Sequence, residues 1–84
     1  MSKLAKLVAS FLAEPAEVDF ADVERLLREF GFQLTMRRGS HNVFRHPDDG
    51  RKLTVPTVGG RRVKRVYVRK IVELLDLEKW HGEE

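Results

Sequence analysis

The chain has 84 residues, a net charge of +3 and an apolar content of 42%. This length allows one domain with a modest core, and the apolar content is ordinary for a globular protein. The sequence contains no cysteine, which excludes disulfides, zinc–thiolate sites and thiol nucleophiles. No apolar run reaches the roughly 18 residues that a membrane span needs, so we expect a cytoplasmic protein without a membrane anchor.

Charge is distributed unevenly along the chain. Residues 1–36 carry four Lys/Arg against six Asp/Glu, residues 37–70 carry eleven against two, and residues 71–84 carry one against five. A basic middle segment between acidic ends is typical of a protein that binds a phosphate backbone. A solvated basic surface would give the same pattern, so charge alone indicates a polyanionic partner but no activity.

Two helices are expected before any strand. Apolar residues spaced three and four apart over 4–12 predict a short amphipathic helix that ends before Pro15. A second helix is expected to begin after Asp19, a good N-cap residue, and to stop at Gly31. Its apolar stripe consists of Val23, Leu26, Leu27 and Phe30.

The apolar period then changes to that of a strand. Apolar residues alternate with polar ones over 32–37, and Arg38-Gly39 indicates a turn into a second strand over 40–46. The run Pro47-Asp48-Asp49-Gly50 is a strong turn signal, after which a third strand is expected from Arg51 or Lys52 to Val55, stopped by Pro56. A loop with the basic run 61–65 is expected to lead to a last helix, whose apolar stripe is Val68, Ile71, Val72 and Leu75.

This order of elements predicts an α+β fold. Short turns make the three strands an antiparallel sheet, helices must cover one of its faces, and an extra helix precedes this unit at the N-terminus. The other face should be open to solvent. If Phe44 points into the core, Asn42 and His46 point the same way, and His41, Val43 and Arg45 lie on the open face.

The common catalytic templates are missing. The chain has no phosphate-binding glycine loop and no HExxH pair, and its three histidines are too few for a metal cage, so no metal or cofactor is expected. What remains is Arg37-Arg38-Gly39-Ser40-His41 in a basic segment. RNA carries its own nucleophile, the 2′-hydroxyl, so a histidine with cations that hold the phosphate can cleave it without a metal. By spacing alone, a lone histidine is more often structural or an RNA contact.

The run Gly39-Ser40-His41-x-x-Phe44-x-His46-Pro47, followed by Asp49-Gly50-Arg51 and Thr54-Val55-Pro56, resembles the HicA family of toxin–antitoxin ribonucleases. The resemblance covers about residues 18–77, so we expect an N-terminal helical extension over 1–17, a HicA-like domain over 18–77 and an acidic tail over 78–84. It implies a double-stranded-RNA-binding-domain-like fold, ribosome-independent cleavage of mRNA, and neutralisation by a HicB-like antitoxin.

The resemblance also implies roles for single residues. His41 matches the family's catalytic histidine, and Gly39 matches the glycine that permits a tight turn before it. Many members have a second histidine at the next position, where this chain has Asn42; if that histidine were the essential one, this protein would be weakened or inactive. RNA contacts are expected from Arg37, Arg38, Arg45, Lys52, Arg61, Arg62, Lys64 and Arg65, with the first two nearest the reacting phosphate.

Other residues have structural interpretations. His46 is expected to be a partly buried strand-end histidine bonded to the turn. Trp80 is expected to pack the last turn or a partner surface, and His81 to have no role in the chemistry. Two alternatives to the ribonuclease stay open: a non-catalytic RNA-binding module on the same fold, and a protein adaptor whose helices or open sheet face bind a partner.

Overall fold

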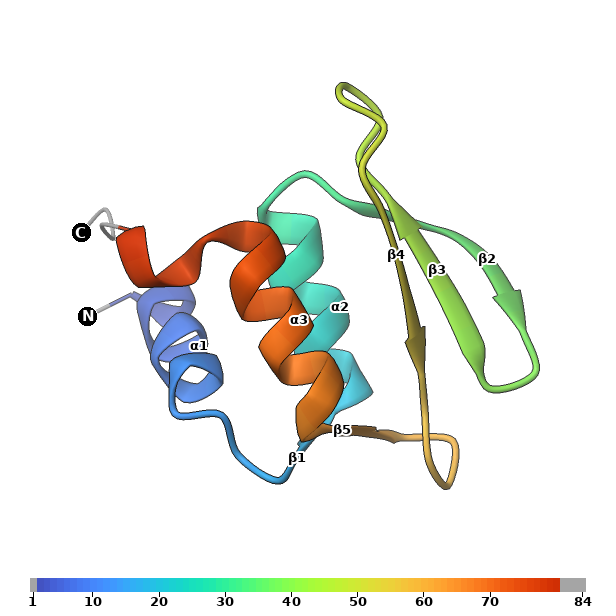
Figure 1. Cartoon of the computed structure of the whole chain (residues 1–84), viewed down its shortest axis with the longest axis horizontal. Helices are drawn as coiled ribbons and strands as arrows, with labels where there is room; N and C mark the ends of the chain where they lie inside the picture. Colours follow the sequence, from blue (N-terminus) through green and yellow to red (C-terminus); the bar gives the residue numbers. More distant parts are fainter. Residues whose placement is uncertain (1, 81–84) are drawn as a thin grey trace.

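The computed structural model describes residues 2–80 (Figure 1). Its helices are α1 (Lys3–Leu12), α2 (Phe20–Glu29) and α3 (Arg65–Leu75), with a 3-10 turn, η1, at Leu77–Lys79. Its strands are β1 (Glu17–Asp19), β2 (Gln33–Arg38), β3 (His41–Arg45), β4 (Lys52–Pro56) and β5 (Arg62–Lys64). The predicted α+β fold, with three helices and a three-stranded antiparallel sheet, is confirmed.

The larger sheet has the order β2-β3-β4, and all its pairs are antiparallel. A second, two-stranded sheet pairs β1 with β5, with Val18 opposite Val63. The expectation of a loop throughout the basic run before the last helix was therefore wrong, because Arg62–Lys64 is a strand. Each of these strands has three residues and a single apolar one, which is too short for a recognisable period.

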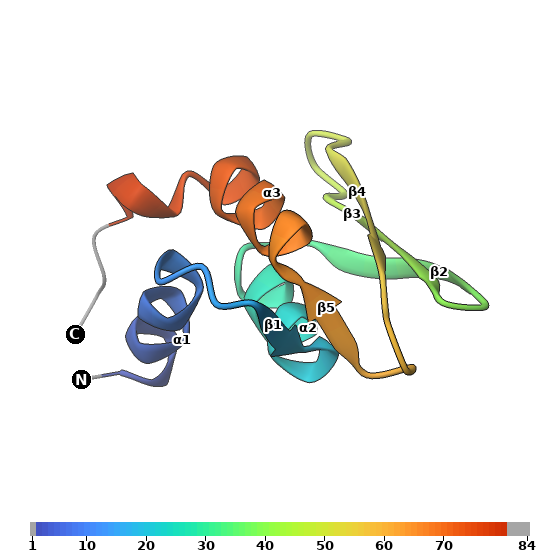
Figure 2. The same ribbon diagram turned by 60° about the horizontal axis from the view of Figure 1, so that its bottom comes forward.

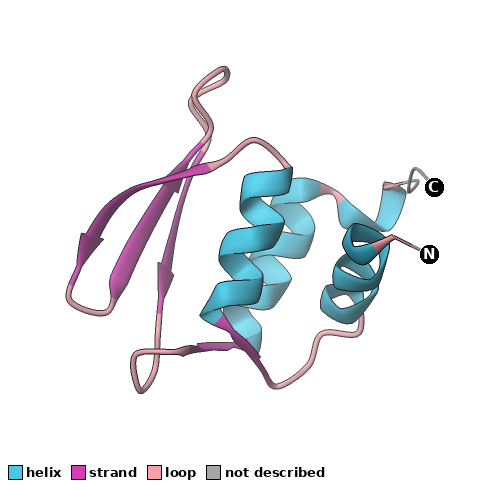
Figure 3. Ribbon diagram, turned by 180° about the vertical axis from the view of Figure 1, so that it is seen from behind, coloured by secondary structure: helices cyan, strands magenta, loops and turns pink. Residues whose placement is uncertain are grey.

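The helices and the larger sheet lie in layers. Helices α2 and α3 stand side by side along one face of the sheet, and α1 lies on their far side (Figures 1 and 2). The view from behind shows the same order, with the three strands separated from α1 by the helix pair (Figure 3). Leu7, Val8 and Phe11 of α1 are buried in the same core as the stripes of α2 and α3. The open face of the sheet is therefore the one turned away from all three helices.

The ends of α2 follow the sequence signals. Asp19 is its N-cap, and Gly31, at φ +93°, follows its last turn in the conformation that glycine favours. A Cβ on Gly31 would lie 2.7 Å from Nε2 of His46, so the turn also brings the backbone close to the β3–β4 hairpin. The predicted stripe of α3 is buried, as is that of α2 except for Phe30, which is partly buried and packs on Trp80 with ring centroids 6.4 Å apart. His81 lies outside the described residues.

A β-bulge interrupts β2. The pairing register shifts between Leu34, which opposes Phe44, and Met36, which opposes Val43, so Thr35 is an extra residue. Regular alternation would place Met36 on the same face as Phe32 and Leu34. Instead Met36 is 53% exposed, because every residue after the bulge has changed face.

Candidate nucleic-acid interface

The face of the three-stranded sheet turned away from the helices is polar and basic. Cross-strand partners share a face, so the register defines three rows across it. These rows, which we call the open face, are Arg38–His41–Pro56, Met36–Val43–Thr54 and Gln33–Arg45–Lys52. The cations of the outer two rows therefore flank the central row, in which Met36 and Val43 are apolar.

His41 lies at the end of the open face. It opens β3 directly after the two-residue turn Gly39-Ser40, and its cross-strand partner is Arg38. Gly39 has φ +58°, the conformation that the first position of a type II′ hairpin turn requires. The predicted facing of β3 is confirmed, since His41 is exposed and the next residue, Asn42, is buried. The tight turn thus holds an exposed histidine beside an arginine.

Asn42, the residue after His41 in β3, faces the helices. It is 4% exposed. Its Nδ2 donates to the backbone oxygens of Val55 (3.0 Å) and Ser40 (3.3 Å), and its Oδ1 accepts from Nε of Arg37 (3.0 Å). These bonds tie the β2–β3 turn to β4, so the side chain supports the hairpin from the face opposite His41.

The bulge at Thr35 determines which of Arg37 and Arg38 lies on the same face of the sheet as His41. Arg37 pairs with Asn42 and lies on the helix side, where its guanidinium carbon is 5.6 Å from the centroid of the Phe20 ring. The expectation that Arg37 lies beside His41 was therefore wrong, and Arg38 alone of the two shares its face. Alternation in the sequence contains no signal for this change.

A second basic group lies at the far end of the open face. Arg45 and Lys52 are cross-strand partners, both are exposed, and Gln33 completes their row. From His41 to Arg45 the strand advances four residues, about 13 Å at the usual rise of a β-strand. The open face therefore presents cations at both ends of β3.

The four cations of the basic segment 61–65 differ in whether their side chains bind other described residues. Arg62 pairs with Glu17 at 3.2 Å and Asp19 at 2.6 Å, and hydrogen bonds to these two carboxylates raise the pKa of Arg62. Arg65 donates from Nε to the backbone oxygen of Glu14 at 2.8 Å. Among the described residues, the side chains of Arg61 and Lys64 have no such partner, so they are the two of this group that remain available to a phosphate.

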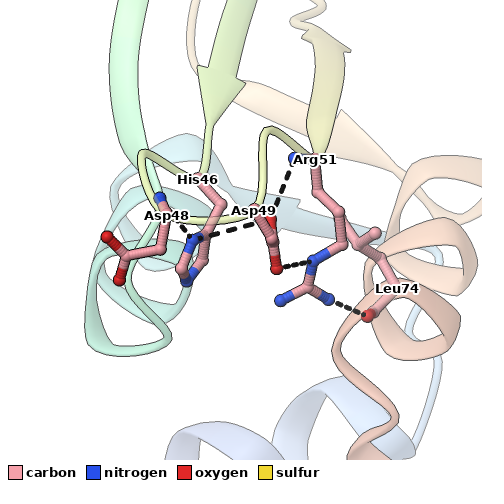
Figure 4. A network of polar contacts seen from close by, with 5 residues as sticks. All are labelled: His46, Asp48, Asp49, Arg51 and Leu74. Atoms are coloured by element: carbon pink, nitrogen blue, oxygen red, sulfur yellow. Dashed lines mark hydrogen bonds and ion pairs between the residues drawn. The ribbon is translucent and has the colours of Figure 1, made fainter.

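The β3–β4 turn is held by its own polar network (Figure 4). Nδ1 of His46 accepts from the backbone N–H of Asp48 at 3.2 Å, which confirms the predicted bond to the turn. The backbone N–H and the guanidinium of Arg51 both bind Asp49 and lower the pKa of that carboxyl. Arg51 also donates to the backbone oxygen of Leu74 at 3.1 Å, so the hairpin is tied to the end of α3.

Within residues 2–80, no three His, Asp or Glu side chains come together in a group that could hold a metal ion. The same part of the chain has no helix long and apolar enough to cross a membrane.

A family model described as the HicA toxin of bacterial toxin–antitoxin systems matches residues 20–77. The match begins with the first residue of α2 and ends in η1, so it includes β2, β3, β4, β5 and α3. No curated protein and no solved structure gives a significant match to the chain.

Proposed function

The chain belongs to the HicA toxin family, and from this premise we propose that it is a toxin-type endoribonuclease that cleaves mRNA without a metal. His41 is the proposed catalytic residue, and a HicB-like antitoxin is the proposed partner that neutralises it in the cytoplasm. The observation that carries the proposal is the exposed His41 paired with Arg38 at the end of a basic, solvent-facing sheet surface.

The proposed reaction uses the nucleophile of the substrate. The ribose 2′-oxygen attacks the neighbouring phosphorus, and the bond from phosphorus to the 5′-oxygen breaks. The 2′-hydroxyl loses a proton and the leaving 5′-oxygen gains one; His41 is proposed to act in this proton transfer. Arg38 can hold the non-bridging oxygens and stabilise the charge that develops on them. The expected products end in a 2′,3′-cyclic phosphate and a 5′-hydroxyl.

The remaining cations suit the RNA backbone beyond the reacting phosphate. Arg45 and Lys52 lie about 13 Å along β3 from His41, so a single strand laid along the sheet would meet positive charge at both ends. Arg61 and Lys64, whose side chains bind no group within residues 2–80, add cations near the start of α3. We propose that Arg62 and Arg65 contribute less, since both already bind groups near the N-terminal end of the chain.

The decisive experiment compares cleavage of a long mRNA by the wild-type chain and by His41→Ala in the presence of a metal chelator. We expect the variant to retain its thermal stability and its RNA affinity while losing at least 100-fold in cleavage rate, the order of a missing general acid–base group. His81→Ala is the matched histidine control and should cleave normally. Undiminished cleavage by His41→Ala would remove His41 from the catalytic role.

The same samples separate the ribonuclease from a non-catalytic RNA-binding module. A module would bind RNA with a strong salt dependence but yield no new RNA ends, with or without His41. Growth arrest on production of the chain alone, relieved by a HicB-like protein, would identify the partner.

A further inference from the structure

A cleft of about 510 Å³ lies on the side of the sheet opposite His41. Its lining includes Phe20 at the start of α2, Arg37 and Asn42 from the hairpin, Ser40 in the turn, and Arg61 before β5. The volume is within the range of pockets that hold small organic groups. The mechanism proposed above uses none of this space.

One wall of the cleft is a flat cation of fixed orientation. Arg37 is held by the bond from its Nε to Asn42, and its guanidinium lies over the ring of Phe20 at 5.6 Å. Phe20 is itself fixed, since it packs on the buried ring of Phe44 with centroids 5.9 Å apart. Single-stranded RNA bases stack on aromatic rings and on arginine planes. The pair of Phe20 and Arg37 is therefore a preformed stacking surface.

The charges around the cleft are slightly positive in total, which suits a segment of RNA with a neutral base and an anionic backbone. Its two lining carboxylates already have cation partners, because Asp19 pairs with Arg62 at 2.6 Å and Glu24 pairs with Arg28 at 3.1 Å. The guanidinium ends of Arg37 and Arg61 are not paired with a carboxylate among the described residues. The lining alone has no net charge, and together with Arg28, Arg62 and Glu17, which also pairs with Arg62, it carries +1.

Polar groups that can recognise a base edge surround the stacking surface. Ser40 and Thr57 line the cleft, and the backbone N–H (2.9 Å) and hydroxyl (3.4 Å) of Thr57 both donate to the backbone oxygen of Ser40. Hydroxyls both donate and accept hydrogen bonds, as base edges do. A phosphate group alone would bind only the cations of the cleft and would make no use of the stacking surface formed by Phe20 and Arg37.

The cleft and His41 are separated only by the β2–β3 turn. Gly39, Ser40 and Asn42 line the cleft, and His41, between them in sequence, points to the open face. We propose that the cleft binds a nucleobase of single-stranded RNA, stacked on Arg37, while the phosphate next to that nucleotide lies at His41. The RNA strand then passes around the β2–β3 turn, from the cleft to the open face. This inference rests on the proposed function for the identity of the ligand, and it makes Arg37 a binding residue for that base.

The test measures base binding without cleavage. The probes are 2′-O-methyl RNA oligonucleotides, which lack the nucleophile, each with one abasic position moved along the strand. With the wild-type chain we expect one position at which loss of the base weakens binding roughly 5- to 100-fold, the usual effect of one stacked base. Arg37→Lys keeps the charge but removes the plane, so the penalty at that position should fall to the level of its neighbours. Arg25→Lys, on the same helix as Phe20 but outside the cleft, is the matched control and should keep the penalty.

Three results would overturn the inference. The first is an equal loss of binding by the wild-type chain at every abasic position. The second is a position-specific penalty that persists in Arg37→Lys. The third is an Arg37→Lys variant that binds RNA normally and loses only affinity for a HicB-like protein, which would make the cleft a protein-docking site. If unmodified RNA is still cleaved in a His41-dependent way, the proposed function is retained and only the base-site proposal is rejected. If the wild-type chain neither binds nor cleaves RNA, the proposed function and the base-site proposal are both rejected.

Discussion

Replacing Asn42 by alanine separates support of the hairpin from chemistry at His41. The side chain is 4% exposed and makes three hydrogen bonds, two through its amide nitrogen and one through its oxygen. Each of the two bonds to backbone oxygens contributes about 1 kcal/mol, and the bond from the exposed Arg37 contributes less because solvent screens that charge. We therefore expect Asn42→Ala to lower the free energy of unfolding by about 2–3 kcal/mol. For a domain of this size that corresponds to a loss of about 10–20 °C in Tm.

The assay pairs thermal unfolding, followed by circular dichroism, with RNA cleavage at a temperature where every variant is folded. Asn42→Ala should be less stable, and loss of its bond to Arg37 should weaken RNA binding, but at saturating RNA it should still cleave within about tenfold of the wild-type rate, because position 42 faces away from His41. His41→Ala should show the opposite pattern, with unchanged Tm and lost cleavage. Asn42→Asp keeps the acceptor for Arg37 but loses both donors, so its Tm should fall at least as far as that of the alanine variant.

The reasoning is refuted if Asn42→Ala unfolds at the wild-type temperature, since the three bonds would then contribute nothing. It is also refuted if the folded variant is as inactive as His41→Ala. That result would mean that position 42 takes part in the chemistry despite its place on the helix side.

Three further predictions concern the surroundings of the site. Gly31→Ala should lower the free energy of unfolding by about 1–3 kcal/mol, because it strains a positive φ and its Cβ would meet His46 at 2.7 Å; urea denaturation measures the loss. Lys64→Ala should reduce the salt dependence of RNA binding by about one phosphate contact, whereas Arg62→Ala should reduce it less; equal slopes for the two variants would contradict the assignment of Arg62 to its carboxylates. The pKa of Asp49 is lowered in the folded protein. Its contribution to stability is therefore complete above the pKa that Asp49 has in the unfolded chain, and it is lost as the pH falls through the lowered pKa of the folded state. Proton NMR of the arginine Nε–H that it binds should show that loss on acidification, and Asp49→Asn should abolish the pH dependence.

Much of the fold was predictable because its signals are long or repeated. The stripes of α2 and α3 each include residues on successive turns, and a buried Phe44 in the middle of β3 fixed which way His41 faces. The β1–β5 pair was not predictable. Its strands contain one apolar residue each, and their partners lie more than forty residues apart in sequence.

The candidate site was predictable in its residue types but not in its arrangement. Apolar residues alternate without a break from Phe32 to Met36, so nothing in the pattern reveals that Thr35 is an extra residue. Because of this extra residue, Arg37 lines the cleft on the helix side and does not lie beside His41 as expected. Likewise, the partners of Arg62 are carboxylates 45 and 43 residues away, and only the folded chain brings them together.

The bulge at Thr35 also affects how the protein avoids aggregation. A three-stranded sheet has two free edges, and unpaired edge strands invite other chains to add to them. On β2 the bulge breaks the regular spacing of edge hydrogen-bonding groups, and on β4 the terminal Pro56 has no N–H to donate. Exposed Arg38 and Lys52 add like charge to the two edges. The cations proposed to hold RNA would thus also repel the sheets of neighbouring molecules, and RNA binding, by neutralising them, would leave the bulge and the proline as the remaining protection.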